Sequence, residues 1–443
     1  FISSPNLPHA VSSVIHLLLA FGMGFMLVKV IPRESTLARL LSLVLLYILV
    51  TPSAVRWLND GMETGLELCF VAILCLLTFQ QSNRRTTTYA QYVGFTILAL
   101  FTALLRTELV FLCGIAFAIL VWKGVLRSER GNDPARWLKL ALCSSHLMLG
   151  CFLAMVLIFL RMHTLLPDTA IAKAGGSFNL GTFHTAATVL AGALTFGVGL
   201  LLLWLLSLFL LFRSGRFSVP ALFANIVFPA VLLLAALRGQ AIQGARYLVW
   251  TYFFSTLWNI LELGTVRSDR PLLKQGYSLV YGLIVILLIT LPFECKIMYG
   301  VLTRRAATMK IFEGQHLDIL QGKHGTASDI GYIGYFSRAD ICDLAGLVNG
   351  RAAARLTKDE RFTACAASHP DFVFGNINQI KNLSEFMPMG DWQVCSQYDF
   401  VNVRTPDTHY LLFPPSTAAA SCNAISGSPV YPLRELLAGS RTP

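Results

Sequence analysis

The sequence predicts a polytopic α-helical membrane protein, with about ten transmembrane helices, followed by a small soluble C-terminal α/β domain. Composition is the first reason. The chain is 55% hydrophobic and 13% charged, whereas soluble domains carry about 25% charged residues. The second reason is the order of the apolar residues. Over residues 9–293 they form successive stretches of about 20 residues, long enough to cross a bilayer, and a polar tail follows.

Residues 1–293 are predicted to be the transmembrane domain. We expect its helices near 9–30, 37–54, 61–80, 88–105, 108–126, 138–160, 186–212, 217–237, 246–265 and 275–293. The stretch 186–212 illustrates the pattern, because it contains no Lys, Arg, Asp or Glu. A helix that is apolar on every side is either buried in a large core or inserted in lipid. So many such stretches in one chain favour lipid.

Residues 294–443 are predicted to form the soluble domain. Their hydrophobic segments shorten to strand length, and we expect strands at 339–348, 371–375, 394–403 and 409–413. Amphipathic patterns predict helices over 302–320 and 352–368. Helices that alternate with strands are typical of an α/β domain, and a segment of this length can bury a modest core of its own.

The net charge of +11 follows the loops and does not indicate a nucleic-acid partner. Most Lys and Arg of the helical part fall in alternate loops, at 29–39, 81–87, 123–139, 213–216 and 267–274. Short cytoplasmic loops collect these residues. The basic loops are therefore expected in the cytoplasm, and the tail is expected on the outer face, in the periplasm or outside the cell.

The cysteines indicate no metal centre. Five of the ten lie in the expected spans, where Cys behaves as a small apolar residue, and no pair has the CxxC spacing of a zinc site. The tail contains Cys342, Cys365, Cys395 and Cys422. An oxidising outer compartment would permit disulfides among them, but spacing alone leaves their pairing open.

Acidic residues gather at the outer start of the third expected span. Asp60, Glu63 and Glu67 are spaced so that a helix would place them on one face. Asp60 and Glu63 also suit a capping-box variant at a helix N-terminus, which is a structural role. Glu67 lies a turn deeper, and an ionisable group inside a membrane is costly and by default functional.

Three basic residues on the outer side are candidates for holding an anion. Arg106 and Glu108 lie in a short turn, where both could face a cavity or form an interfacial salt bridge. Lys173 follows Asp168 in the Gly-containing outer loop 161–185, which could bind phosphate or could be an ordinary solvated loop. Arg246 opens the ninth span beside a Tyr, as interfacial anchors also do.

Six segments together resemble the motifs of one family. They are GMETGLE (61–67), RTE (106–108), LLPDTAIAKAGG (165–176), ARYL (245–248), DIGYIGYFSRADICDLAGLVN (329–349) and HPDFVF (369–374). Their order is that of the family motifs, and they extend over most of the chain. The chain resembles membrane glycosyltransferases of the GT-C superfamily, close to the mycobacterial terminal arabinofuranosyltransferases and their bacterial relatives.

The resemblance implies a GT-C-like enzyme in a bacterial inner (plasma) membrane. Its donor would be a polyprenyl-phosphate sugar, its acceptor a glycan or lipid on the outer face, and transfer would invert the anomeric carbon. Membrane lipids are further expected partners, and nucleic acid is not. No definite cofactor is implied, and a divalent metal ion is left open.

The expected chemistry assigns roles to the polar groups. A carboxylate must take the acceptor hydroxyl proton, and cations must hold the departing phosphate. The candidate catalytic residues are Asp60, Glu63 and Glu108. The candidate substrate-binding residues are Glu67, Arg106, Asp168, Lys173, Arg246 and Tyr335, the last within the segment 329–349.

The chain departs from the family pattern at three points. Asp168 stands where the family has Asn, and Thr107 stands where it has Pro. The acidic loop that supplies the family's base would precede Phe1, so we expect an upstream segment that carries it.

Two other functions stay open. A transporter or flippase of lipid-linked sugars would also place charges in the membrane, and a scaffold would use the outer domain to bind a partner. A transferase requires the candidate residues to converge on one outward-open cavity. A transporter requires polar groups spread across the membrane thickness.

Overall fold

The computed structural model describes residues 7–51, 62–83, 89–129, 134–162, 183–237, 244–265, 271–314, 317–328, 330–346, 353, 355–401, 406–425 and 430–438. The chain forms two compact units, and the described residues change from one unit to the other between Lys296 and Ile297.

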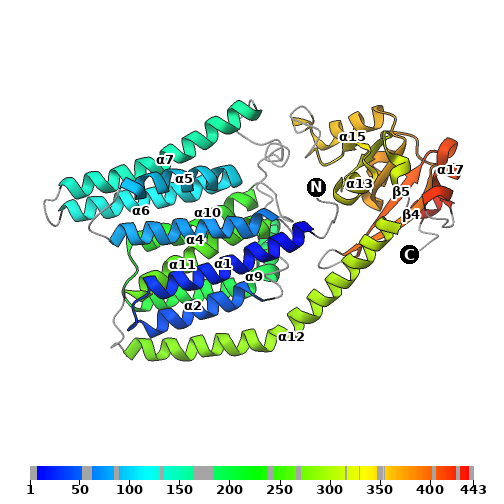
Figure 1. The fold of residues 1–443 in the computed structure, drawn as a ribbon. Helices are drawn as coiled ribbons and strands as arrows, with labels where there is room; N and C mark the ends of the chain where they lie inside the picture. Colours follow the sequence, from blue (N-terminus) through cyan, green and yellow to red (C-terminus); the bar gives the residue numbers. More distant parts are fainter. Residues whose placement is uncertain are drawn as a thin grey trace. The chain divides into compact units, whose positions relative to one another are not determined.

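The first unit is built from helices (Figure 1). They are α1 (Leu7–Val30), α2 (Thr36–Leu49), α4 (Met62–Asn83), α5 (Tyr89–Leu105), the short η1 (Thr107–Leu109), α6 (Val110–Glu129), α7 (Pro134–Met162), α9 (Phe183–Arg213), α10 (Val219–Leu237), α11 (Gly244–Gly264) and the first part of α12 (Pro271–Gly314). Each stretch that the sequence predicts to be a span is therefore helical over most of its length.

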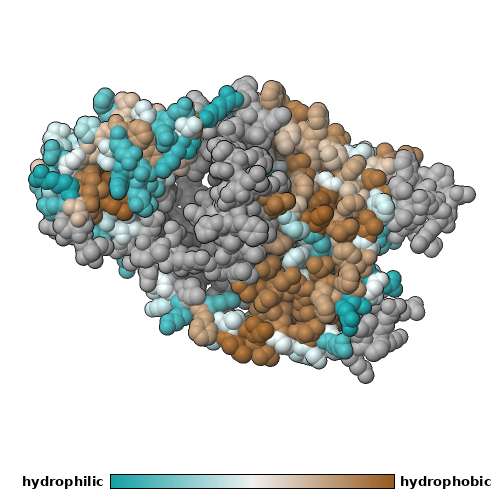
Figure 2. Space-filling model, turned by 180° about the vertical axis from the view of Figure 1, so that it is seen from behind, coloured by the Kyte–Doolittle hydropathy of each residue, from teal (hydrophilic) through white to brown (hydrophobic). Residues whose placement is uncertain are grey.

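Three of these helices are long and apolar enough to cross a membrane, among the residues described. The segments are Leu66–Asn83 in α4, Ser144–Arg161 in α7 and Gln275–Lys296 in α12. The outer surface agrees with a lipid environment, because large apolar side chains such as Phe21 and Phe152 are more than half exposed. Figure 2 shows hydrophobic side chains over much of one face of this unit. Water-soluble monomers rarely expose apolar patches of this extent.

The core of the helical unit is centred on α11. Every residue from Val249 to Gly264 is buried, and α2, α4, α9 and α10 pack against this helix. Trp250 and Trp258 are among its largest buried side chains. A helix that is buried on every side has no face turned to solvent, so the polar residues of α11, such as Asn259 and Glu262, are buried as well.

One polar cluster joins three helices inside this core. The Asn225 side chain on α10 donates to Asn259 Oδ1 on α11 at 2.8 Å, and Asn259 donates back to Asn225 Oδ1 at 3.1 Å. Trp204 Nε1 and Ser207 Oγ on α9 bond to the same two amides, at 2.9 and 3.2 Å. The amides thus satisfy one another, as buried polar groups must.

The second unit contains a six-stranded mixed sheet with the order β2-β1-β3-β5-β4-β6. Its strands are β1 (His324–Ala327), β2 (Asp340–Asp343), β3 (Phe372–Asn376), β4 (Gln393–Val401), β5 (Pro406–Phe413) and β6 (Tyr431–Pro432). The pairs β1–β2 and β1–β3 are parallel, and the others are antiparallel. The helices are η2 (Leu317–Leu320), α13 (Ile330–Ser337), α15 (Lys358–Ala367), α16 (Ile377–Ser384), α17 (Pro415–Ile425) and α18 (Leu433–Leu437).

Helices cover both faces of this sheet. Phe372 and Phe374 of β3 contribute to one apolar cluster, with Phe312 from the end of α12 and residues of η2, α13 and α17. Val373, between them in sequence, contributes to the other cluster, with residues of α15, α16 and α18. Successive strand residues point to opposite faces, so the apolar run of β3 suits a strand buried on both sides.

The structure corrects the predicted elements of the tail at three points. The helix expected over 302–320 is the continuation of α12 as far as Gly314, followed by η2, so the helix that contains the last predicted span continues beyond 293. Pro292 lies inside α12 without ending it. Strand β1 was not predicted, because its sequence HGTA lacks alternation. A side chain at Gly325 would collide with the Phe372 ring. The helices α13, α16, α17 and α18 were also not predicted.

Candidate functional site

A buried ion pair joins two of the predicted site residues. Arg106 Nη1 lies 3.2 Å from Glu67 Oε2 and 3.4 Å from Glu67 Oε1. Glu67 comes from the second turn of α4, and Arg106 stands between α5 and η1. The side chains are 1% and 7% exposed, respectively. Leaving either charge unpaired at this depth would cost several kcal/mol, so each residue requires the other.

A break in the helix aims Arg106 inward. The residue is extended, at φ −152° and ψ 125°, where it forms the N-cap of η1. The Arg106 carbonyl accepts from the Leu109 N–H at 3.0 Å, which closes the short turn. Glu108 within the same turn is exposed. The sequence left open whether Arg106 and Glu108 face a cavity or form a salt bridge, and the structure shows a salt bridge from Arg106 to Glu67 on another helix.

The pair defines what this location can do chemically. A guanidinium carries five N–H donors in a planar fork, and those of one nitrogen contact Glu67. Arginine can bind a phosphate or a carboxylate in bidentate fashion, through two parallel N–H···O hydrogen bonds. Arg106, oriented by Glu67, is thus a group suited to an anion. Glu67, held as the partner of an arginine, is suited to orientation rather than to accepting a proton.

Several predicted site residues cannot be placed beside this pair. Asp60, Asp168 and Lys173 lie outside the described residues. Glu63, Arg246 and Tyr335 belong to α4, α11 and α13, but their side chains also lie outside the description. The backbone puts Glu63 one helical turn before Glu67, on the same face of α4. The convergence of the whole set on one cavity stays a prediction.

In the tail, part of the predicted motif has a structural role. Asp343 Oδ1 accepts from the Ala345 N–H at 2.8 Å, directly after β2. Gly346 follows with a positive φ of 71°, and a Cβ there would collide with the Arg361 side chain. Asp343 is buried. These residues shape the turn after β2, because only Gly adopts this conformation at no steric cost.

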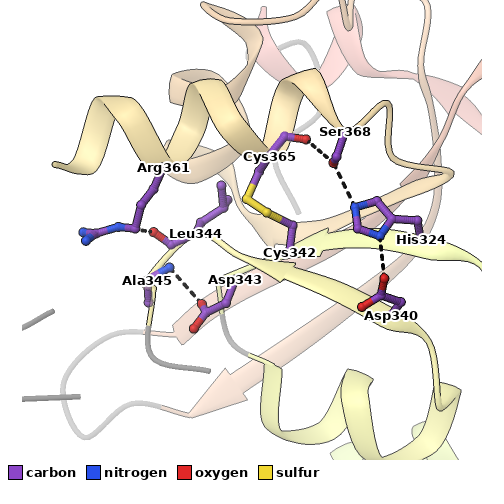
Figure 3. Close-up of a disulfide and its surroundings, with 9 residues drawn as sticks. All are labelled: His324, Asp340, Cys342, Asp343, Leu344, Ala345, Arg361, Cys365 and Ser368. Atoms are coloured by element: carbon purple, nitrogen blue, oxygen red, sulfur yellow. Dashed lines mark hydrogen bonds and ion pairs between the residues drawn. A yellow bond between two sulfur atoms is a disulfide. The ribbon is translucent and has the colours of Figure 1, made fainter. Parts of the chain in front are cut away.

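A second polar cluster in the tail was missed by the sequence analysis (Figure 3). His324 Nδ1 lies 3.1 Å from Asp340 Oδ2, and His324 Nε2 lies 2.8 Å from Ser368 Oγ. The Ser368 hydroxyl also donates to the Cys365 carbonyl at 2.7 Å. Asp371 Oδ2 accepts from the His324 N–H at 2.9 Å. No motif could reveal the cluster, since its residues lie 16 to 47 positions from His324.

The described residues contain two disulfides, and both lie in the tail. Cys342 of β2 pairs with Cys365 of α15, and Cys395 of β4 pairs with Cys422 of α17. The free cysteines among the described residues, Cys69, Cys75, Cys113, Cys151 and Cys295, all belong to the helical unit. The structure thus settles a pairing that the sequence left open. The residues described contain no group of three or more His, Cys, Asp or Glu placed to hold a metal ion.

Comparison with known proteins finds one match, in the tail. A family described as a domain of unknown function, DUF8728, matches residues 304–413, from the last part of α12 to the end of β5. The matched segment contains the residues of the His324 cluster and the Cys342–Cys365 disulfide. It lies outside the helical unit. No curated protein matches the chain.

Proposed function

We propose that this protein is a membrane glycosyltransferase of the GT-C type. It would transfer a sugar from a polyprenyl-phosphate donor to a glycan or lipid acceptor, with inversion. The observation that carries the proposal is the Arg106–Glu67 pair. These residues belong to two segments, GMETGLE and RTE, that resemble family motifs. The two residues are 39 positions apart in the chain and meet in a buried contact.

The geometry suggests a division of roles. Arg106 binds the donor phosphate, and Glu67 holds the guanidinium in place for it. The proton acceptor is then one of the other carboxylates, Asp60, Glu63 or Glu108. Of these, Glu108 is the described side chain, and its exposure leaves it accessible to an acceptor hydroxyl.

The disulfides support the proposed topology. Cytosolic proteins rarely keep structural disulfides, whereas periplasmic and secreted proteins do. Two disulfides in the tail and free thiols in the helical unit suit a tail on the outer face. The same orientation places the loops rich in Lys and Arg in the cytoplasm, where such loops are usually found. We therefore propose about ten spans over 1–293 in a bacterial plasma membrane, with the domain 294–443 outside.

Transport is the second candidate. The observation that favours it is the polar cluster of Asn225, Asn259, Trp204 and Ser207 inside the helical core. Polar groups within membrane proteins often line transport paths. These amides, however, are neutral and bond to each other, which is how interhelical hydrogen bonds hold helices together. We therefore propose that these amides hold the helices together, and we favour sugar transfer over transport as the function.

The deciding experiment uses the protein in lipid nanodiscs with radiolabelled polyprenyl-phosphate sugars and an acceptor glycan. The expected result is labelled acceptor, reduced at least tenfold by Arg106→Lys, since lysine keeps the charge but loses the planar fork. Transport is tested in proteoliposomes with the same donors. Movement of donor between leaflets without any labelled acceptor would replace the transferase by a flippase.

A further inference from the structure

The His324 cluster contains the hydrogen-bond order of an acid–base–nucleophile relay. The carboxylate of Asp340 contacts Nδ1 of His324, and the hydroxyl of Ser368 contacts Nε2 of the same ring, at 3.1 and 2.8 Å. A carboxylate on Nδ1 keeps the proton on that nitrogen and leaves Nε2 as a hydrogen-bond acceptor. The Ser368 hydroxyl has one proton, so it donates to Nε2 when it turns from the Cys365 carbonyl to the ring. The distances lie within the range expected for a nucleophile and its base.

The main chain holds these groups in place. The N–H of His324 donates to Asp371 Oδ2, and the Asp371 N–H donates to the His324 carbonyl at 2.7 Å. The disulfide Cys342–Cys365 links β2, on which Asp340 lies, to α15, which ends just before Ser368. Supports of this kind are what keeps a reactive constellation at its working geometry.

The nucleophile is open to solution. Ser368 is exposed, His324 is about one-third exposed at 32%, and Asp340 is 82% exposed. His369, directly after Ser368, has a positive φ of 49°. A substrate would therefore approach Ser368 from the solvent, and a bulky substituent on it could remain in solution.

The chain offers a matched comparison in Ser384. Like Ser368, it is a serine at the end of a helix, and its hydroxyl donates to the carbonyl three residues earlier, at 2.6 Å. Ser384 is half-buried, whereas Ser368 is exposed. The Ser384 hydroxyl makes this helix-end bond, whereas the Ser368 hydroxyl also contacts a histidine that contacts a carboxylate. The bond to His324 is therefore more than a consequence of a serine at a helix end.

We propose that Ser368, His324 and Asp340 form a second reactive site, which cleaves solvent-exposed carboxylic esters. Ser368 Oγ bonds to the ester carbonyl carbon, and its proton passes to His324 Nε2. The carbon–oxygen bond to the alcohol breaks as the alcohol oxygen takes that proton. Water then attacks the acyl-serine by the same route, which releases the acid and restores the hydroxyl. Asp340 is a positioning residue, and the proposal does not depend on sugar transfer by the helical unit.

The backbone around Ser368 predicts slow turnover. The N–H groups of Ser368 and His369 donate to the Ala364 and Ala366 carbonyls, so neither is available for a developing oxyanion. Donors for that oxygen usually contribute a large part of the rate. Covalent trapping is therefore a better readout than ester turnover.

The test is labelling of the full chain in detergent by a fluorophosphonate, followed by peptide mass spectrometry. In the trapping reaction Ser368 Oγ bonds to phosphorus, fluoride leaves, and the proton passes to His324. We expect the adduct on Ser368 and none on Ser384. His324→Ala should slow labelling by about a hundredfold, as loss of a general base does, and Ser384→Ala should not change it.

Two further variants separate positioning from folding. Asp340→Asn should slow labelling while Asp340→Glu retains part of the rate, because a carboxylate is kept. Melting temperature of each variant controls for folding. Labelling of wild-type Ser368 no faster than that of Ser384 would overturn the proposal, and this comparison requires no variant. An equal loss in Asp340→Asn and Asp340→Glu would remove Asp340 from the site.

Discussion

Arg106 Nη1 lies 3.2 Å from Glu67 Oε2, and both side chains are buried. The two residues are 39 positions apart in the chain. A buried pair of this kind has two separable properties. Each charge depends on its partner for stability, and the guanidinium is oriented in a way that a surface arginine is not. Stability and function can therefore be tested by different variants of the same two residues.

Loss of one partner should cost more stability than loss of both. Arg106→Met removes the guanidinium that pairs with the buried Glu67 carboxylate, and we expect this to lower the free energy of unfolding by about 3–5 kcal/mol. The double variant with Glu67→Met buries no charge and should recover most of this loss. Unfolding in mixed detergent micelles measures both. If the double variant transfers sugar normally, the pair serves the fold only, and Arg106 has no part in binding donor.

The cysteines should divide into a reactive and a protected class. A maleimide added to the native protein should label exposed Cys295, while Cys342, Cys365, Cys395 and Cys422 should react only after reduction. Cys295→Ser should remove most of the native labelling. Tail labelling without reductant, detected by peptide mapping, would contradict the disulfides and the proposed outer location.

The Cys342–Cys365 disulfide should stabilise the tail. It closes a loop with a sequence separation of 23, for which the chain-entropy estimate is about 3 kcal/mol. Replacement of both cysteines by Ala should therefore lower the melting temperature. It should also slow fluorophosphonate labelling of Ser368, since β2 and α15 lose their covalent link. Unchanged melting would show that the packed sheet alone holds these elements.

The hydrogen bonds between the amides of Asn225 and Asn259 should stabilise the contact between α10 and α11. Asn225→Leu leaves Asn259 with fewer partners in an apolar core, and we expect a loss of about 1 kcal/mol, in the range measured for hydrogen bonds between membrane helices. Leu222→Ala, on the exposed side of α10, is the control and should change little. Loss of donor movement in proteoliposomes at unchanged stability would instead favour the transport function.

The start of α15 should be sensitive to acid. Thr357 and Glu360 form a capping box, and the backbone and side-chain hydrogen bonds from Thr357 lower the pKa of Glu360 below its usual value. A carboxyl whose pKa is lower in the folded state stabilises that state above the unfolded pKa. The contribution is lost as the pH falls through the folded value. Protection of the amides in the first turn of α15 against hydrogen exchange, corrected for the intrinsic rate at each pH, should therefore fall below about pH 4.

A second capping box provides the control for this pH effect. Asn376 and Gln379 make the same reciprocal bonds at the start of α16, and neither side chain titrates. Exchange there should not respond to the same acidification, and Glu360→Gln should remove the response of α15. Parallel acceleration in both helices would indicate general loosening of the domain.

Local features of the sequence predicted most of the helical unit. The bounds of α5, expected over 88–105 and found at Tyr89–Leu105, show why. Apolar length and helix-terminating polar residues are properties of neighbours in the chain. The same reasoning was less successful in the tail, where β1 has no apolar alternation and owes its place to parallel pairing with β2 and β3.

The candidate site was predicted only in part. Glu67 stood out because an acid deep in an apolar stretch is costly, and its burial agrees with that argument. Its partner could not be chosen, since Arg106 had Glu108 as a nearer neighbour in sequence. For His324 no signal existed, because an isolated His, Ser and Asp are common in any polar segment.

By itself, the sequence determined which segments are helical, which cysteines belong to the tail, and which ionisable groups are out of place in an apolar setting. All of these depend on residues close together in the chain. The tertiary structure alone decided that Glu67 meets Arg106, that Cys342 pairs with Cys365 and Cys395 with Cys422, and that one histidine bridges an aspartate and a serine. Such contacts join distant residues, and packing of whole elements sets which side chains come within a few ångströms.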